Sequence, residues 1–170
     1  MAVVNKSGSV NKLTSVDSPT PTGLSQSATN GGKIAFIRDT VEVAASDDNN
    51  SVYRLARIPS NAVIVDLRVN NDAITAGTDY NVGVYDTPEI NGGAVISDNA
   101  FADALDLSSA SAGEGTFALS AVAIENRHKQ VWQHAGLSAD PKKLVDIALT
   151  GITVGTAAGT ITLSVIYSLV

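Results

Sequence analysis

The chain contains no cysteine, and this absence excludes disulfides, thiolate metal ligands and cysteine nucleophiles. Only two histidines are present, His128 and His134, and their separation of six residues would not place them on one helical face. With so few suitable side chains, we expect no catalytic dyad, no metal site and no bound cofactor.

Basic residues are also scarce. The 11 Lys and Arg side chains are outnumbered by 17 Asp and Glu, giving a net charge of -6 and a pI near 4.7. Because nucleic-acid affinity comes largely from cations that neutralise phosphates, this balance opposes a nucleic-acid partner. Aromatic residues make up only 5% of the chain, too few for an obvious sugar-stacking platform.

Long apolar runs are missing as well. No stretch approaches the length of uninterrupted apolar sequence that spans a bilayer, so we expect no membrane partner. Residues 1–12 lack the basic segment and continuous apolar run of a secretory signal. These features predict a soluble protein made in the cytoplasm.

The 170 residues, 44% hydrophobic and 16% charged, are sufficient for one domain with its own core. Residues 1–32 differ from the rest, because they are rich in Ser, Thr, Asn and Gly and show no apolar period. We predict an extended polar arm over 1–32 and a folded domain over 33–170. The arm is expected to lie on its own domain or on a neighbouring subunit. Its predicted partner contacts are Val3, Val4, Lys6, Lys12 and Leu13.

A two-residue rhythm organises the folded domain. Apolar residues alternate with polar ones over 63–69, over 80–84 and again over 145–149 and 161–165, as in strands with one wet face. Together with 53–58, the first two segments predict an antiparallel meander. The predicted core anchors are Val63, Val65, Leu67, Val82, Trp132, Ile161 and Leu163.

Other segments carry weaker signals. Residues 34–43 predict a strand or strand pair with an irregularity at Arg38 and Asp39. The acidic stretch 46–50 favours a solvated turn over a calcium loop, because it lacks the spaced carboxylates and terminal Glu of an EF-hand.

Two helices and a loop are predicted in the second half. Residues 97–99 could cap a short helix through 100–105, and 108–115 reads as a small-residue loop. A clearer helix is predicted over 124–135, ending at Gly136 in a left-handed C-cap.

About eight strands with one or two short helices predict an all-β fold, an antiparallel two-sheet β-sandwich or jelly roll. A parallel α/β sheet is disfavoured because helices do not alternate with strands. Candidate phosphate loops at 31–33 and 155–159 lack the residues that a P-loop requires. The carboxylates of Asp103, Asp106, Glu114 and Glu125 show no catalytic spacing, so we expect no enzymatic activity.

Four segments resemble a family of small virion proteins of tailed bacteriophages. They are residues 53–62 (YRLARIPSNA), 76–85 (AGTDYNVGVY), 131–141 (VWQHAGLSADP) and 155–167 (GTAAGTITLSVIY). The resemblance covers about residues 33–170 and consists of turn and strand signatures, so it carries over no catalytic positions.

This resemblance implies a head decoration, or cement, protein with a jelly-roll-like β-sandwich. It implies binding to the major capsid protein on the capsid surface of the virion, and a homodimer or homotrimer. The alternative interpretation is a β-sandwich binding module of a phage tail or appendage that recognises host surface glycan.

Overall fold

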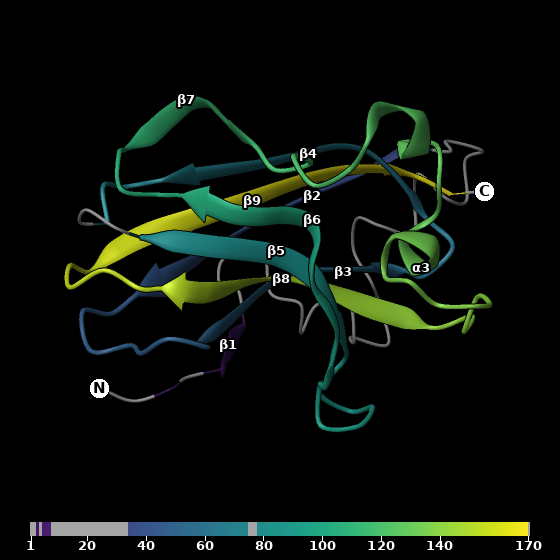
Figure 1. The fold of residues 1–170 in the computed structure, drawn as a ribbon, viewed down its shortest axis with the longest axis horizontal. Coiled ribbons are helices and arrows are strands. Elements are labelled where there is room, and N and C mark those ends of the chain that lie inside the picture. The colour runs from purple at the N-terminus through teal and green to yellow at the C-terminus, as the bar shows by residue number, and fades with distance from the viewer. Residues whose placement is uncertain (1–2, 4, 8–33, 75–77, 170) are drawn as a thin grey trace.

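A computed structural model of the protein describes residues 3, 5–7, 34–74 and 78–169. They form two β-sheets packed face to face, one ordered β1-β3-β8-β5-β6 and the other β2-β9-β4-β7 (Figure 1). The strands are β1 (Asn5–Ser7), β2 (Ile34–Val43), β3 (Val52–Pro59), β4 (Val63–Asn71), β5 (Asp79–Asp86), β6 (Val95–Asp106), β7 (Ser111–Phe117), β8 (Leu144–Thr153) and β9 (Gly159–Ser168). The helical segments within these residues are the 3-10 turn η1 (Ile124–Asn126) and α3 (Val131–His134).

Eight of these strands pair as four nested antiparallel couples: β2 with β9, β3 with β8, β4 with β7, and β5 with β6. Each successive couple joins strands closer together in the chain, so the chain winds as one long folded hairpin. This is the jelly-roll topology. The predicted all-β, two-sheet fold is confirmed. β1 differs from the other strands, because it adds to β3 in parallel.

The core lies between the sheets and follows from the two-residue period. In β9, Ile161 and Leu163 are fully buried, while Thr160 and Thr162 keep partial access to solvent. Leu67 of β4 is also fully buried. Because each sheet has one apolar face, the two faces are removed from water only by packing against each other.

Val65 corrects the predicted core. It is 56% exposed, whereas Ile64 and Leu67 on either side of it are buried. The pairing of β4 with β9 shifts register between Ile64 and Asp66, so Val65 is the extra residue of a β-bulge. The bulge leaves Val65 facing outward, and its prediction as a core anchor is wrong.

The predicted short helix over 100–105 is also wrong, because this segment belongs to strand β6. The pairing of β5 with β6 shifts register in three places, and Ala104 has a φ of 50°. These irregularities interrupt the two-residue period, so buried Phe101 and Leu105 recur at a helical spacing without being in a helix.

The single helix predicted over 124–135 is replaced by η1 and α3, and Ile124 is 81% exposed. Tertiary hydrogen bonds interrupt it: the Val131 amide donates to the Ala62 carbonyl at 2.9 Å and the Trp132 amide to the Ser60 carbonyl at 3.0 Å. The predicted end is correct, since Gly136 has a φ of 74°.

Strand β2 runs from Ile34 to Val43 and pairs with β9 without a register shift, so the irregularity predicted at Arg38 and Asp39 is absent from this pairing. Ile34 and Phe36 face outward from it. Residues 46–50 form the predicted turn, although Asp47 within it is buried and accepts a hydrogen bond from Tyr53. The predicted loop over 108–115 instead contains the start of β7.

Candidate functional site

Metal-binding groups were sought across the part of the chain that the structure describes, and no cluster of three or more His, Cys, Asp or Glu side chains is present there. His128 is exposed, whereas His134 is half-buried with its ring 5.6 Å from that of Phe101. Burial lowers the pKa of His134 from 6.5. Within the described residues, no helix has both the length and the apolarity to cross a bilayer.

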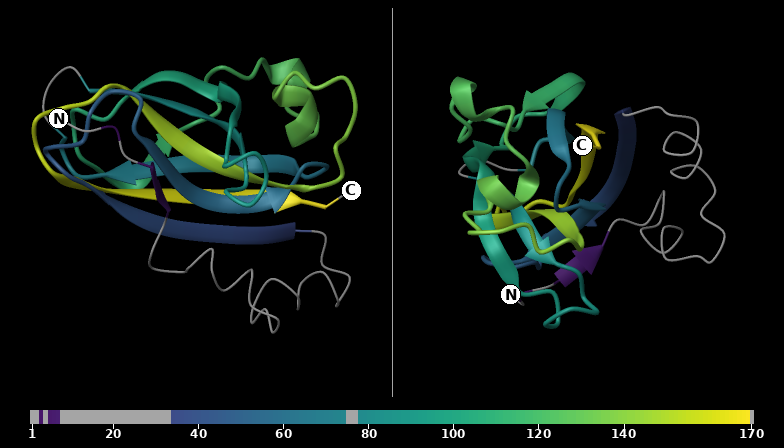
Figure 2. Two further views of the ribbon diagram at one scale, coloured as in Figure 1. Left: turned by 90° about the horizontal axis from the view of Figure 1, so that it is seen from below. Right: turned by 90° about the vertical axis from the view of Figure 1, so that its right-hand side faces the viewer.

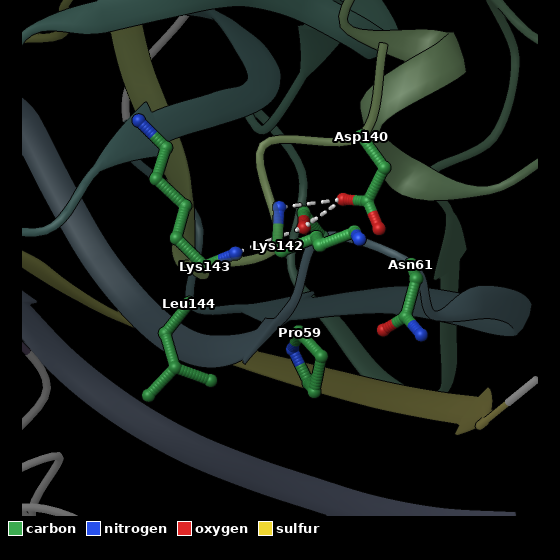
Figure 3. Close-up of a pocket in the computed structure, with 7 residues that line it drawn as sticks. Pro59, Asn61, Asp140, Lys142, Lys143 and Leu144 are labelled. Carbon is green, nitrogen blue, oxygen red and sulfur yellow. Dashed lines mark hydrogen bonds between the residues drawn. The ribbon is translucent and has the colours of Figure 1, made fainter.

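A shallow pocket of about 400 Å³ lies where β3 ends and β8 begins (Figure 3). The Asp140 carboxylate accepts hydrogen bonds from the Ser60 hydroxyl at 2.5 Å and the Lys142 amide at 2.9 Å. Both bonds lower the pKa of Asp140, and the bond from Ser60 has the larger effect. The pocket is lined by Pro59, Ser60, Asn61, Asp140, Lys142, Lys143 and Leu144.

The polar groups of this pocket have structural roles. The Asp140 carboxylate fixes the turn before β8, where Lys142 adopts a φ of 52°. The Lys143 ammonium is directed to the carboxylate of Asp86. A carboxylate whose pKa is lowered by two hydrogen bonds is ionised at neutral pH, so it is a poor general acid, and the lowered pKa also makes it a weaker base. This geometry therefore favours a braced turn over acid–base catalysis.

Next to the pocket, the outer side of the five-stranded sheet holds a buried ion network. Asp146 of β8 is fully buried between two arginines of β3. Its carboxylate accepts from the Arg57 Nε at 2.8 Å, and its Oδ2 lies 3.3 Å from the Arg54 Nη1. A buried carboxylate is tolerated only when it is paired and hydrogen-bonded, and two guanidinium groups provide this here.

Arg54 also fastens the connection between β5 and β6, which projects from the sandwich at the bottom of Figure 1. It donates to the Asp86 carbonyl at 2.9 Å and to the Gly93 carbonyl at 2.6 Å. Gly93 has a φ of 74°, and a Cβ there would lie 2.5 Å from the Arg54 Nη2. The network therefore holds the base of an exposed loop in one position.

Asp86 ties the pocket to this network. Burial alone would raise its pKa, but hydrogen bonds from Lys143 and Asn91 keep the pKa below its ordinary value. The pKa of Glu89, exposed on the loop, is lowered by hydrogen bonds to its own backbone amide and to Thr87. Both carboxylates therefore stay ionised near neutral pH.

The predicted arm contacts fall mostly outside the described residues. Val4, Lys12 and Leu13 lie outside them, Lys6 is in β1 opposite Tyr53, and Val3 is 62% exposed.

Among the predicted core anchors, Leu67, Val82, Ile161 and Leu163 are fully buried, while Val63 and Trp132 are only partly buried. The indole nitrogen of Trp132 donates to the Gln130 side chain at 2.5 Å. The ion network was not predicted. Its only sequence signal is a pair of arginines three residues apart inside an otherwise apolar strand.

No protein-family model matches the chain, and no curated protein matches its sequence. Solved structures do match its fold. A chain from the capsid of Ralstonia phage GP4 is 18% identical with a TM-score of 0.58, covering 89% of this chain and 90% of that one. A chain from the capsid asymmetric unit of cyanophage Pam1 is 13% identical with a TM-score of 0.52, covering 81% and 85%. The chain therefore shares its fold with proteins found in phage capsids.

Proposed function

We propose that the chain is a structural virion protein that binds the outside of a tailed-phage capsid and stabilises it, as a decoration or cement protein. The observation that carries this proposal is the jelly-roll fold, matched over 89% of the chain by a chain from a phage capsid. Support also comes from the resemblance of four turn and strand segments to a decoration-protein family. We also propose that the chain has no enzymatic activity.

The proposed stabilising role can be explained by the way in which a capsid lattice comes apart. Packaged DNA pushes capsid subunits apart at their seams, and a protein that buries surface on both sides of a seam opposes that separation. Many copies bound to one lattice make individually small interfaces add up. A braced β-sandwich suits this role, because a rigid body loses little conformational entropy when it binds.

The proposed partners are the major capsid protein and further copies of this chain, as a homodimer or homotrimer. The location that follows is the capsid surface, after synthesis in the host cytoplasm. Residues 1–32 are proposed as an arm that extends this contact beyond the domain.

Sedimentation with two targets tests the proposal. Purified protein is mixed with undecorated phage heads and, separately, with host cells, and each target is pelleted. We expect the protein to pellet with heads and to raise the temperature at which they release DNA. Pelleting with cells alone would contradict the proposal and favour a glycan-binding appendage module. Sedimentation velocity of the free protein gives its oligomeric state.

A further inference from the structure

Three of the large apolar side chains that remain exposed lie on the outer face of the four-stranded sheet. Ile34, Phe36 and Val65 are 61%, 54% and 56% exposed. Ile166 of β9 lies between them, because Phe36 and Asp66 both pair with it and Val65 directly precedes Asp66. Strands β2, β9 and β4 run side by side (Figure 2). We call the side chains of Ile34, Phe36, Val65 and Ile166 the apolar corner.

The bulge in β4 creates one side of this corner. In an unbroken strand, inward-facing Ile64 and Leu67 could not both be buried, because their separation is odd. The bulge restores the inward direction for Leu67 and leaves both Val65 and Asp66 on the outer face. An apolar side chain is thereby held in water by the backbone itself, at a cost that contact with a partner would recover.

A row of arginines borders the corner on the same face. The Arg38 guanidinium lies 5.4 Å from the Phe36 ring, and its Nε donates to Ser164 at 2.8 Å. Across the sheet, the guanidinium groups of Arg68 and Arg127 lie 5.9 Å and 4.8 Å from the ring of Phe117. We call Arg38, Arg68 and Arg127 the arginine row.

Within the row, Arg127 is the side chain placed to bind a further anion, because its guanidinium is exposed and stacked on Phe117. Arg68 is paired with Asp66 through its Nε at 2.8 Å, while Arg127 is exposed. Stacking on an aromatic ring restricts a guanidinium to one orientation, so less entropy is lost when it binds a carboxylate. Arginine and aromatic side chains are also the residue types that dominate binding energy at protein interfaces.

The chemistry of the partner follows from these two features. Stacked guanidinium groups bind carboxylates, and the corner accepts an apolar side chain. The net charge of -6 opposes a polyanion such as nucleic acid. The attraction proposed here is therefore local, between an exposed guanidinium and a carboxylate closer than about 10 Å, the screening distance in salt. We propose that the apolar corner and the exposed guanidinium of Arg127 together dock on a protein surface that presents a carboxylate beside an apolar side chain. This inference rests on the proposed function, in which that surface belongs to the capsid lattice.

Two variants with matched exposure test the apolar corner. Val65→Asp places a charge in the corner, and Val95→Asp places one on β6 in the other sheet, where Val95 is 57% exposed. Binding of each full-length variant to undecorated heads is measured by co-sedimentation, and thermal melting checks folding. We expect both variants to melt like the wild type, with Val65→Asp binding at least about tenfold more weakly and Val95→Asp unchanged.

A charge-reversed pair tests the arginine row. Arg127→Glu is compared with Lys142→Glu, which makes the same change of charge beside β8 of the other sheet. We expect only Arg127→Glu to weaken head binding, by about tenfold at low salt and by less as salt screens the contact.

The possible outcomes separate the two proposals. If the wild type does not bind heads, the proposed function and this inference both fail. If the wild type binds and Val65→Asp binds equally well, the proposed function stands and this docking surface is wrong. If Val65→Asp instead changes the sedimentation coefficient of the free protein, the corner belongs to a contact between copies of the chain, which also overturns the inference.

Discussion

Val65 and Leu67 are two residues apart on β4 but face opposite environments, because of the bulge between Ile64 and Asp66. We predict that Leu67→Asp abolishes folding, or costs more than about 4 kcal/mol, because it buries a carboxylate among apolar side chains. Val65→Asp should change the free energy of unfolding by less than about 1 kcal/mol. Chemical denaturation of both variants checks this, and equal losses would mean that the bulge is absent.

Tyr53 and Tyr80 offer a second comparison at the residue scale. Their rings lie 6.0 Å apart and both are fully buried. The Tyr53 hydroxyl donates to Asp47 at 2.9 Å, while the Tyr80 hydroxyl has no hydrogen-bond partner among the described residues. Burial, followed by the charge of Asp47, raises the pKa of Tyr80 to about 12.

We predict that Tyr53→Phe costs about 1–2 kcal/mol, because it removes a donor from buried Asp47. Tyr80→Phe should be neutral or stabilising, since it removes a buried hydroxyl that lacks a partner. Urea denaturation measures both. A larger loss for Tyr80→Phe than for Tyr53→Phe would reveal a partner for the Tyr80 hydroxyl.

At the scale of elements, the ion network joins β3, β8 and the loop after β5, and it can be compared with an exposed ion pair in the same fold. Asp146→Asn removes the buried carboxylate that the two guanidinium groups share and should cost about 3–5 kcal/mol. Asp66→Asn breaks the partly exposed pair with Arg68 and should cost less than about 1 kcal/mol.

Denaturant unfolding measures both losses. Amide exchange in residues 87–93 provides a second measurement, because only Asp146→Asn should loosen the loop that Arg54 holds. Equal losses from the two substitutions would show that the buried network stabilises the fold no more than the exposed pair does. Unchanged amide exchange in residues 87–93 would show that the network does not secure the loop.

The arm is the second element to test. We predict that deletion of residues 1–32 leaves a folded jelly roll, because all eight strands of the four nested couples lie after residue 33. The melting temperature should fall by only a few degrees, reflecting loss of the short pairing between β1 and β3. Circular dichroism and calorimetry check this, and loss of a cooperative transition would place the arm in the core.

At the scale of the whole molecule, stability should depend on pH on both sides of neutrality. His134 has a lowered pKa in the folded state, so below pH about 6.5 the unfolded chain binds a proton that the folded chain resists. Stability is therefore lost as the pH falls through that range. The carboxyl groups of Asp86, Glu89 and Asp140 also have lowered pKa values, and the stability they contribute is lost at lower pH, below about 4.5.

Above pH about 10, stability falls as the pH rises. Buried Tyr53 and Tyr80 have raised pKa values in the folded state, so they lose their protons more readily when the chain is unfolded. Denaturation midpoints from pH 4 to 11 should therefore show a broad maximum near neutrality. His134→Asn should flatten the slope between about pH 5 and 7. An unchanged slope in this variant would assign the slope to other groups.

Much of the fold follows from local pattern. Alternation over 63–69 and 161–165 predicts strands because one face of each must leave water, and the number of strands predicts two stacked sheets. The left-handed end at Gly136 is also local, since glycine adopts positive φ at little cost.

Other features depend on residues that are distant in the sequence, and these features were seen only in the tertiary structure. The bulge at Val65 comes from the register with β9, about a hundred residues later in the chain. Residues 100–105 lie in strand β6 because this strand pairs with β5, and the pairing overrides a local pattern that also fits a helix. The contacts of Asp146 with Arg54 join residues 92 positions apart. The sequence alone therefore determined which residues needed burial, while the pairing of distant strands decided which side chains stayed in water, because register sets the face of every residue in a strand.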